Sequence, residues 1–283
     1  MDRGIKLNTN QLDLGGITIS WLNGGEFYLD GGTMFGAVPK LLWSRKYPPD
    51  DENFIKMLAA PLLVRTAESA ILIDTGLGSK LTDKLKKIYR VSRRWTADQD
   101  LARLGLSTRD IACVILTHCD FDHAGGIVTI NKDGKPELTF PNALHIINEM
   151  EWQDVKHPNS RSIHAYFPEN FATLEESGRM VLINQDYEAA PGVKVRHSGG
   201  HTRGHQIVEI TGRNGCALHL GDLMPTHAHA NPLWIMAYDN FPLEVISQKE
   251  QWIERYRDRG CWFTFYHDDF IKAGRMDSRG QIH

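Results

Sequence analysis

Apolar and polar residues alternate along the first half of the chain in a pattern that predicts strands around one helical stretch. Residues 17–25 (ITISWLNGG) indicate a strand that runs into a glycine turn. Residues 60–76 (APLLVRTAESAILIDTG) indicate two strands around a polar turn, a hairpin that ends on Asp74. Residues 79–104 are rich in Lys, Arg and Leu and predict helix. Residues 111–116 (IACVIL) form the short apolar run typical of a strand buried on both faces.

The second half of the chain adds further strands and helices, including a second predicted hairpin. The predicted elements are a strand with a short helix at 142–155, an irregular segment at 157–180, a strand at 192–201, a hairpin at 206–212 and 216–222, a helix at 242–260 and a strand at 261–268. Strands and helices in this order predict an α/β sandwich of mixed sheets with helices on the outside.

No internal repeat and no low-complexity linker divides the sequence, so we expect a single domain over residues 1–283. Residues 26–53 are rich in Gly, Pro and aromatic residues and predict a long loop. We expect this loop to serve either as a lid over a site or as an arm that contacts a second copy in a homodimer.

Composition excludes several classes of partner. The formal net charge of -3 gives no electrostatic reason to bind nucleic acid or an anionic membrane surface. We find no apolar run near 18 residues and no apolar segment at the N-terminus, so we expect neither a membrane span nor a secretory signal. The four cysteines are scattered without a CxxC pair, which predicts reduced thiols in a cytoplasmic protein.

Residues 116–126 (LTHCDFDHAGG) place four metal-ligand side chains within six positions, directly after a predicted strand. Further His and Asp residues follow the ends of other predicted strands, so all of them can converge on one edge of a sheet. The predicted metal ligands are His118, Asp120, Asp122, His123, His201, Asp222 and His267. The alternative is a polar loop with helix-capping aspartates, but three more ligand residues arriving in order downstream favour the metal.

The spacing assigns these ligands to two ions. His118 and Asp120 project to the same side of extended backbone and can hold one ion, together with His201. Asp122 and His123 turn toward a second ion as the chain enters a helix. His267 would complete the second site, with Asp222 between two divalent ions about 3.5–4 Å apart that share a bridging hydroxide.

With these residues, the chain resembles the metallo-β-lactamase superfamily. The superfamily pattern H-x-H-x-D-H matches 118–123 except at position 120, and GGHTRGH, HLGD, YHD and LIDTG match later or neighbouring segments. The segments WLNGG, DGGTMFGAVPKLLW and GDLMPTHAH resemble the quorum-quenching N-acyl-homoserine lactonases, with related organophosphate hydrolases nearby. The resemblance implies an αββα sandwich of two mixed β-sheets flanked by helices, carrying one or two metal ions.

Asp120 departs from the superfamily pattern, which has a histidine there. One interpretation is a neutral exchange of ligands, since carboxylate oxygen also binds these metals. The other is altered metal choice, because a charged, harder ligand favours iron or manganese more than imidazole does. The diiron flavoproteins of the superfamily also carry a carboxylate at this position. We expect two divalent ions, zinc first, with iron or manganese as the alternative.

The resemblance implies a hydrolase that opens a lactone ring, with N-acyl-homoserine lactones as the expected substrates. A metal-bridging hydroxide would attack the ester carbonyl beside Asp222, and Asp122 would protonate the leaving oxygen. The residues proposed to form an apolar wall for the acyl chain are Met34, Phe35, Trp43, Phe121, Trp234 and Met236.

Other functions stay open. A phosphotriesterase or another esterase of the same fold is the main alternative, since the same hydroxide can attack phosphorus. A β-lactamase is disfavoured because no export signal is evident. A non-catalytic relative would have lost ligands, and a redox diiron protein would need a flavin domain for which this chain has no length.

Several residues outside the predicted ligand set could support the site or belong to the core. We expect Asp74 either to orient a ligand imidazole or to close a turn. We expect His205 to be structural and His145 to be packed in the core. His227 and His229 would line the cleft or orient Asp222. The candidates for an oxyanion-stabilising phenol, as homoserine lactonases use, are Tyr166 and Tyr238.

Overall fold

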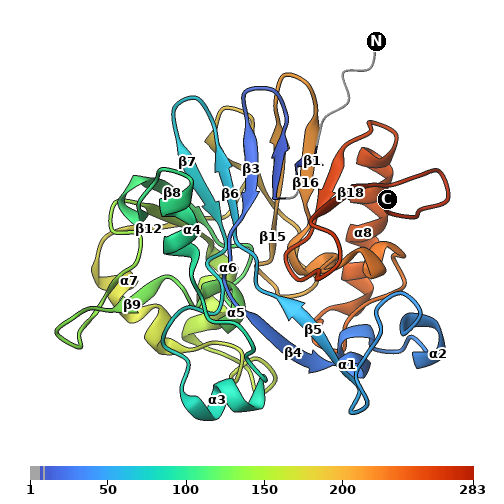
Figure 1. Ribbon diagram of the computed structural model, residues 1–283, viewed down its shortest axis with the longest axis horizontal. Coiled ribbons are helices and arrows are strands. Elements are labelled where there is room, and N and C mark those ends of the chain that lie inside the picture. The colour runs from blue at the N-terminus through green and yellow to red at the C-terminus, as the bar shows by residue number, and fades with distance from the viewer. Residues whose placement is uncertain (1–6, 9) are drawn as a thin grey trace.

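Two mixed β-sheets face each other in the computed structural model, which describes residues 7, 8 and 10–283 (Figure 1). The strands of the larger sheet, in spatial order, are β1 (Leu7–Asn8), β2 (Gln11–Asp13), β3 (Thr18–Trp21), β6 (Leu62–Arg65), β7 (Ala70–Ile73), β8 (Ile111–Ile115), β11 (Leu144–Asn148) and β12 (Met180–Ile183). Neighbours are antiparallel as far as β7 and parallel from β7 to β12.

The second sheet is built from the later part of the chain. Its strands, in order, are β13 (Tyr187–Ala190), β14 (Val193–His197), β15 (Gln206–Thr211), β16 (Cys216–His219), β17 (Trp262–Thr264) and β18 (Ala273–Arg275). Only the β16–β17 pair is parallel. Two small antiparallel pairs join β4 (Glu26–Asp30) to β5 (Phe54–Leu58) and β9 (Val128–Ile130) to β10 (Pro136–Leu138).

The described residues form eight helices. They are α1 (Gly31–Phe35), α2 (Lys40–Trp43), α3 (Asp83–Ile88), α4 (Ala97–Arg103), α5 (Phe121–Ala124), α6 (Glu149–Lys156), α7 (Ala172–Glu176) and α8 (Pro242–Arg257). Short 3-10 turns occupy Thr108–Asp110, Pro168–Asn170, Gly221–Leu223 and His227–Ala230. Among the described residues, no helix is both long and apolar enough to cross a membrane.

Strand alternation divides the core into layers. Val64 and Ile71 point between the sheets, where they pack with Val195 of the second sheet, whereas Leu63 and Leu72 point outward. The outward residues pack against Leu101 of α4, Trp152 of α6 and Leu174 of α7. Val245, Ile253 and Tyr256 of α8 cover the outer face of the second sheet. Figure 1 shows α8 on one side of the molecule and α4 and α7 on the other, which confirms the predicted αββα sandwich.

Most predicted elements are confirmed, including both hairpins. The helix expected over 79–104 is present only as α3 and α4. The long loop predicted at 26–53 is wrong, since this segment contains β4, α1 and α2. The short EFYLD stretch becomes a strand because it pairs with β5, a partner that local composition does not reveal. A role for this segment as a lid or dimer arm stays a prediction.

The cysteines correct a second expectation. Cys216 and Cys261 form a disulfide with a Cα–Cα distance of 4.9 Å, so these two are not reduced thiols. They stand 45 residues apart in sequence but directly before paired positions of the neighbouring strands β16 and β17. Cys113 and Cys119 are free and buried, as expected for small core residues.

We predict that removing this disulfide destabilises the fold without emptying the site. The double variant Cys216→Ser/Cys261→Ser should lose about 2–4 kcal/mol in free energy of unfolding, because the unfolded chain gains freedom over a 45-residue loop. Urea denaturation measures this loss, and reducing agent should produce a similar loss in the wild-type protein. A double variant as stable as the wild type would contradict the crosslink.

Candidate metal centre

The loop after β8 carries four of the predicted ligands. His118 lies in the extended stretch after β8, and Asp120 directly precedes the single-turn helix α5. Asp122 and His123 lie inside that turn. The chain can pass close to its neighbours only because glycines follow: a Cβ atom at Gly125 or Gly126 would stand 2.3 Å from a backbone oxygen.

The first group of ligands is His118, Asp120 and His201. Asp120 Oδ2 lies 3.7 Å from His118 Nε2 and 3.5 Å from His201 Nε2. The His201 side chain arrives from the loop that follows β14. The ligand atoms of all three lie within 4.8 Å of one another, a spacing at which one ion can contact each. We call this group the first triad.

The second triad is Asp122, His123 and His267. Asp122 Oδ2 lies 4.0 Å from His123 Nε2 and 3.6 Å from His267 Nε2, and the two imidazole Nε2 atoms are 3.1 Å apart. His267 follows β17 in the second sheet. One ion can therefore be held between ligands from both sheets.

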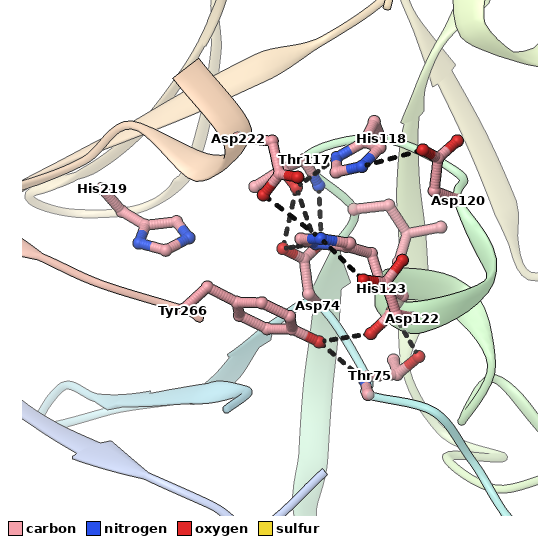
Figure 2. A network of polar contacts seen from close by, with 12 residues as sticks. Asp74, Thr75, Thr117, His118, Asp120, Asp122, His123, His219, Asp222 and Tyr266 are labelled. Atoms are coloured by element: carbon pink, nitrogen blue, oxygen red, sulfur yellow. Dashed lines mark hydrogen bonds and ion pairs between the residues drawn. The ribbon is translucent and has the colours of Figure 1, made fainter. Parts of the chain in front are cut away.

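Asp222 stands between the two triads, with one oxygen facing each. Its Oδ2 is 3.6 Å from His201 Nε2, and its Oδ1 is 3.3 Å from His123 Nε2 and 3.2 Å from His267 Nε2. Figure 2 shows Asp222, Asp122 and Asp74 gathered around the His123 ring. The structure thus brings together all seven residues that the sequence predicts as ligands.

Three atoms of the predicted ligands support a metal site here. His118 Nε2, His201 Nε2 and Asp222 Oδ1 are buried and have no hydrogen-bond partner among the described residues. Buried polar atoms are almost always bonded, so partnerless atoms on neighbouring side chains need an explanation. Imidazole nitrogen with carboxylate oxygen is the donor set of zinc, iron and manganese sites.

Hydrogen bonds on the far side of the imidazoles hold their Nε2 atoms toward the site. Asp74 accepts from His123 Nδ1 at 2.9 Å, which is the orienting contact considered for Asp74 (Figure 2). Asp74 also accepts from the Thr117 hydroxyl, whose oxygen lies 3.0 Å from His118 Nδ1. A single buried carboxylate therefore supports one imidazole of each triad.

Sequence reasoning missed the supports of the other two imidazoles. Asp239 accepts from His201 Nδ1 at 2.8 Å, and the Leu58 carbonyl accepts from His267 Nδ1 at 2.7 Å. Asp239 stands 38 residues from its histidine, so no local motif joins them. A backbone carbonyl such as that of Leu58 leaves no signal in the sequence at all.

Burial and charge move the imidazole pKa values apart. Burial lowers the pKa of His118 well below its usual value, and the neighbouring imidazoles lower it further. Burial alone would also lower the pKa of His123 and His201. The carboxylates outweigh that effect, mainly Asp222 for His123 and Asp120 for His201, and raise both pKa values well above the usual range.

The pKa values of Asp122 and Asp222 shift in opposite directions. Burial raises the pKa of Asp122. Burial would raise the pKa of Asp222 too, but His267 and His123 beside it outweigh this and lower its pKa well below the usual value. In the absence of metal, protons on the imidazoles therefore balance carboxylate charge.

Neither His227 nor His229 contacts Asp222. His227 Nδ1 bonds Asp268, and His229 lies between Thr226 and the Met34 carbonyl, so the expectation that either orients Asp222 is wrong. His205 instead accepts from the Asp222 backbone N–H at 3.1 Å, a structural role as expected. His145 is fully buried in the core.

A cavity of ≈ 220 Å³ opens above the two triads. Its lining includes Met34, Phe121 and Met236 from the predicted apolar wall. Phe35, Trp43 and Trp234 do not line it, which corrects the prediction for these three. The Phe35 ring is instead stacked on Trp43 and packed edge-on against Trp234, so Phe35 and Trp43 belong to the core and the half-buried Trp234 packs against it.

Of the two candidate tyrosines, only Tyr238 lines the cavity. Tyr238 lines it, with its hydroxyl 2.8 Å from Thr33 Oγ1, whereas Tyr166 is buried against Glu151 and does not reach the cavity. Sequence reasoning missed five further lining residues, because they lie on segments without a motif. These are Leu29, Tyr89, Arg161, His164 and Ala165.

Curated proteins with similar sequences include a lactonase and a probable metallo-hydrolase. An N-acyl homoserine lactonase from Bacillus sp is 27% identical over 159 residues, which are 52% of this chain and 56% of that protein. A probable metallo-hydrolase of Mycobacterium tuberculosis is 30% identical over 190 residues, 59% of this chain and 57% of that protein. The chain therefore spans a little over half the length of these curated relatives.

Solved structures match over nearly the whole chain. A probable metal-dependent hydrolase from Staphylococcus aureus has a TM-score of 0.90 and 38% identity, covering 95% of this chain and 96% of that one. A dizinc quorum-quenching lactonase in complex with a product has the same fold, with a TM-score of 0.77, 20% identity, and coverage of 97% and 96%. The family model described as the Metallo-beta-lactamase superfamily matches residues 60–259, and the chain belongs to that superfamily.

Proposed function

We propose that this metal-dependent hydrolase holds two divalent ions and opens the ring of lactones, with N-acyl-homoserine lactones as its first candidate substrates. One observation carries the proposal: two triads share Asp222 at the floor of a cavity with an apolar wall. Two ions bound there would supply a water molecule acidified to react at neutral pH and positive charge for the carbonyl oxygen. Zinc is the first candidate for both.

The cavity lining supports a substrate with an apolar tail. Met34, Phe121 and Met236 are buried and present carbon-rich surface beside the two triads. Such a wall suits an acyl chain, while the polar floor faces the ester. Several Bacillus relatives are named N-acyl homoserine lactonases, which adds support for this substrate class.

Two side chains of the cavity are suited to ring opening, one to transfer a proton and one to stabilise negative charge on the carbonyl oxygen. When water adds to the carbonyl carbon and the ring C–O bond breaks, the leaving oxygen needs a proton. Asp122 lines the cavity, so we assign its carboxylate to take up the proton that the attacking water loses and to deliver it to the leaving oxygen. Tyr238 can donate its hydroxyl hydrogen to the carbonyl oxygen as negative charge develops there.

We predict that metal-loaded protein hydrolyses N-hexanoyl-homoserine lactone, as measured by acid release with a pH indicator. Chelation should abolish turnover, and added zinc should restore it. Asp122→Asn should lower kcat by about 10²–10⁴-fold, because asparagine cannot deliver a proton. Failure to open any acyl-homoserine lactone would refute the substrate assignment and leave the metal assignment standing. Faster turnover of paraoxon than of lactone would assign the protein to the phosphotriesterases instead.

A second prediction concerns the number of ions. Elemental analysis of purified protein should find two ions per chain, and Asp120→Ala should retain one, because the first triad loses its carboxylate while the second stays complete. Asp98→Ala, on the exposed surface of α4, is the matched control and should retain both. Protein without bound metal, or full occupancy in the Asp120 variant, would contradict the assignment.

A third prediction concerns pH. The pKa values of His123 and His201 are raised without metal, so both imidazoles carry protons that an ion must displace. Metal affinity should therefore fall from pH 8 to pH 6, by about tenfold per unit for each proton released. The raised pKa of Asp122 acts in the same direction. Calorimetry in buffers of different ionisation enthalpy counts the protons, and binding without proton release would contradict the prediction.

A further inference from the structure

One buried carboxylate outside the two triads remains without a role. Glu151 lies in the first turn of α6, is 1% exposed, and is held by three hydrogen bonds. Glu151 Oε1 accepts from the Cys119 backbone N–H at 2.9 Å and from the Tyr166 hydroxyl at 3.3 Å. Its Oε2 accepts from the Thr202 hydroxyl at 2.6 Å. Burying a carboxylate is costly, so a residue placed this way needs a reason beyond packing.

The partners of Glu151 are neighbours of metal ligands. Cys119 lies between His118 and Asp120, and Thr202 directly follows His201. The two oxygens of one carboxylate therefore join the two backbone segments that together supply the whole first triad. The backbones are also close at this point, since a Cβ atom at Gly204 would stand 2.2 Å from the Glu151 nitrogen.

The second triad is supported differently. Asp74 and the Leu58 carbonyl hold its imidazoles, and the Tyr266 hydroxyl donates to the Asp122 carbonyl at 2.8 Å. None of these contacts passes through Glu151. The two ion positions thus have separate supports, apart from the shared Asp222 and the Asp74–Thr117 contact.

We propose that Glu151 is a positioning residue that sets the spacing of the first triad, by tying the 118–120 segment to the 201–202 segment. The inference rests on the two-ion site of the proposed function. Loss of the tie lets His201 move relative to His118 and Asp120, so the first ion binds less tightly while the second is unaffected. Residues that orient ligands in this way typically contribute 10–100-fold to metal affinity.

Cobalt titration of metal-free protein tests the inference in two backgrounds. His267→Ala isolates the first triad, and Asp120→Ala isolates the second. Adding Glu151→Ala should weaken cobalt binding by about 10–100-fold in the first background and by less than about threefold in the second. Glu149→Ala, an exposed glutamate on the same helix, is the control and should change neither.

Glu151→Gln separates the tie from the charge. A glutamine oxygen can still accept from Cys119 and Tyr166, and its amide can donate to the Thr202 oxygen. Cobalt affinity of the first triad should therefore recover to within about threefold of that of the Glu151 parent. A loss as large as that of the alanine variant would show that charge, not position, acts on the ion, and would overturn the proposal.

Two single-group variants guard against misfolding of the alanine variant. Thr202→Val removes the bond next to His201 and should lower first-triad affinity by about tenfold. Tyr166→Phe removes a bond to the same carboxylate that touches no ligand segment, and should leave the affinity within about threefold. Equal effects of the two variants, or equal weakening of both triads, would overturn the proposal. Cobalt binding to neither triad would instead refute the two-ion site itself.

Discussion

Three carboxylates, those of Asp120, Asp122 and Asp222, face the same group of imidazoles, and the balance of these charges is the constraint on which the rest of the structure depends. Carboxylates gathered in a largely buried site cannot all stay ionised without positive charge nearby. The carboxylates raise the pKa values of His123 and His201, which favours imidazolium at these positions when no metal is bound. Divalent ions can neutralise the same carboxylates, so metal binding and the charge balance of the site are coupled.

In the sandwich, the predicted ligands follow strand ends, and hydrogen bonds to their far sides hold them in place. Leu58 at the end of β5 both donates its N–H to the His267 carbonyl and accepts from His267 Nδ1. The hairpin of β4 and β5 is therefore part of the metal centre, and its Leu29 also lines the cavity. Met34, in α1 between these strands, lines the same wall. Residues 26–53, which have the composition of a loop, thus supply part of the cavity wall, and the strand that pairs with them supplies the support of His267.

The seven predicted ligands do lie together, because each follows a strand that its own apolar pattern predicts, and strand ends converge by geometry. It did not locate groups whose role depends on distant partners. Asp239 bonds His201 from a loop without periodicity, and Cys216 meets Cys261 only because β16 and β17 pair. Phe35 was assigned to the cavity on residue type, but type does not distinguish a wall from the core one layer below.

The carboxylate of Asp120 changes the balance of ligand types between the two triads. With Asp120, each triad offers two imidazoles and one carboxylate of its own, and both share Asp222. A histidine there would give three imidazoles at one position and two at the other. Equal donor sets would give the two positions similar preferences among metals, and three carboxylates would leave two divalent ions with a net charge of about +1 instead of +2. In the proposed two-ion site, Asp120 would therefore match the two ions to each other and lower the attraction of the site for anions, which suits the uncharged ester proposed as substrate.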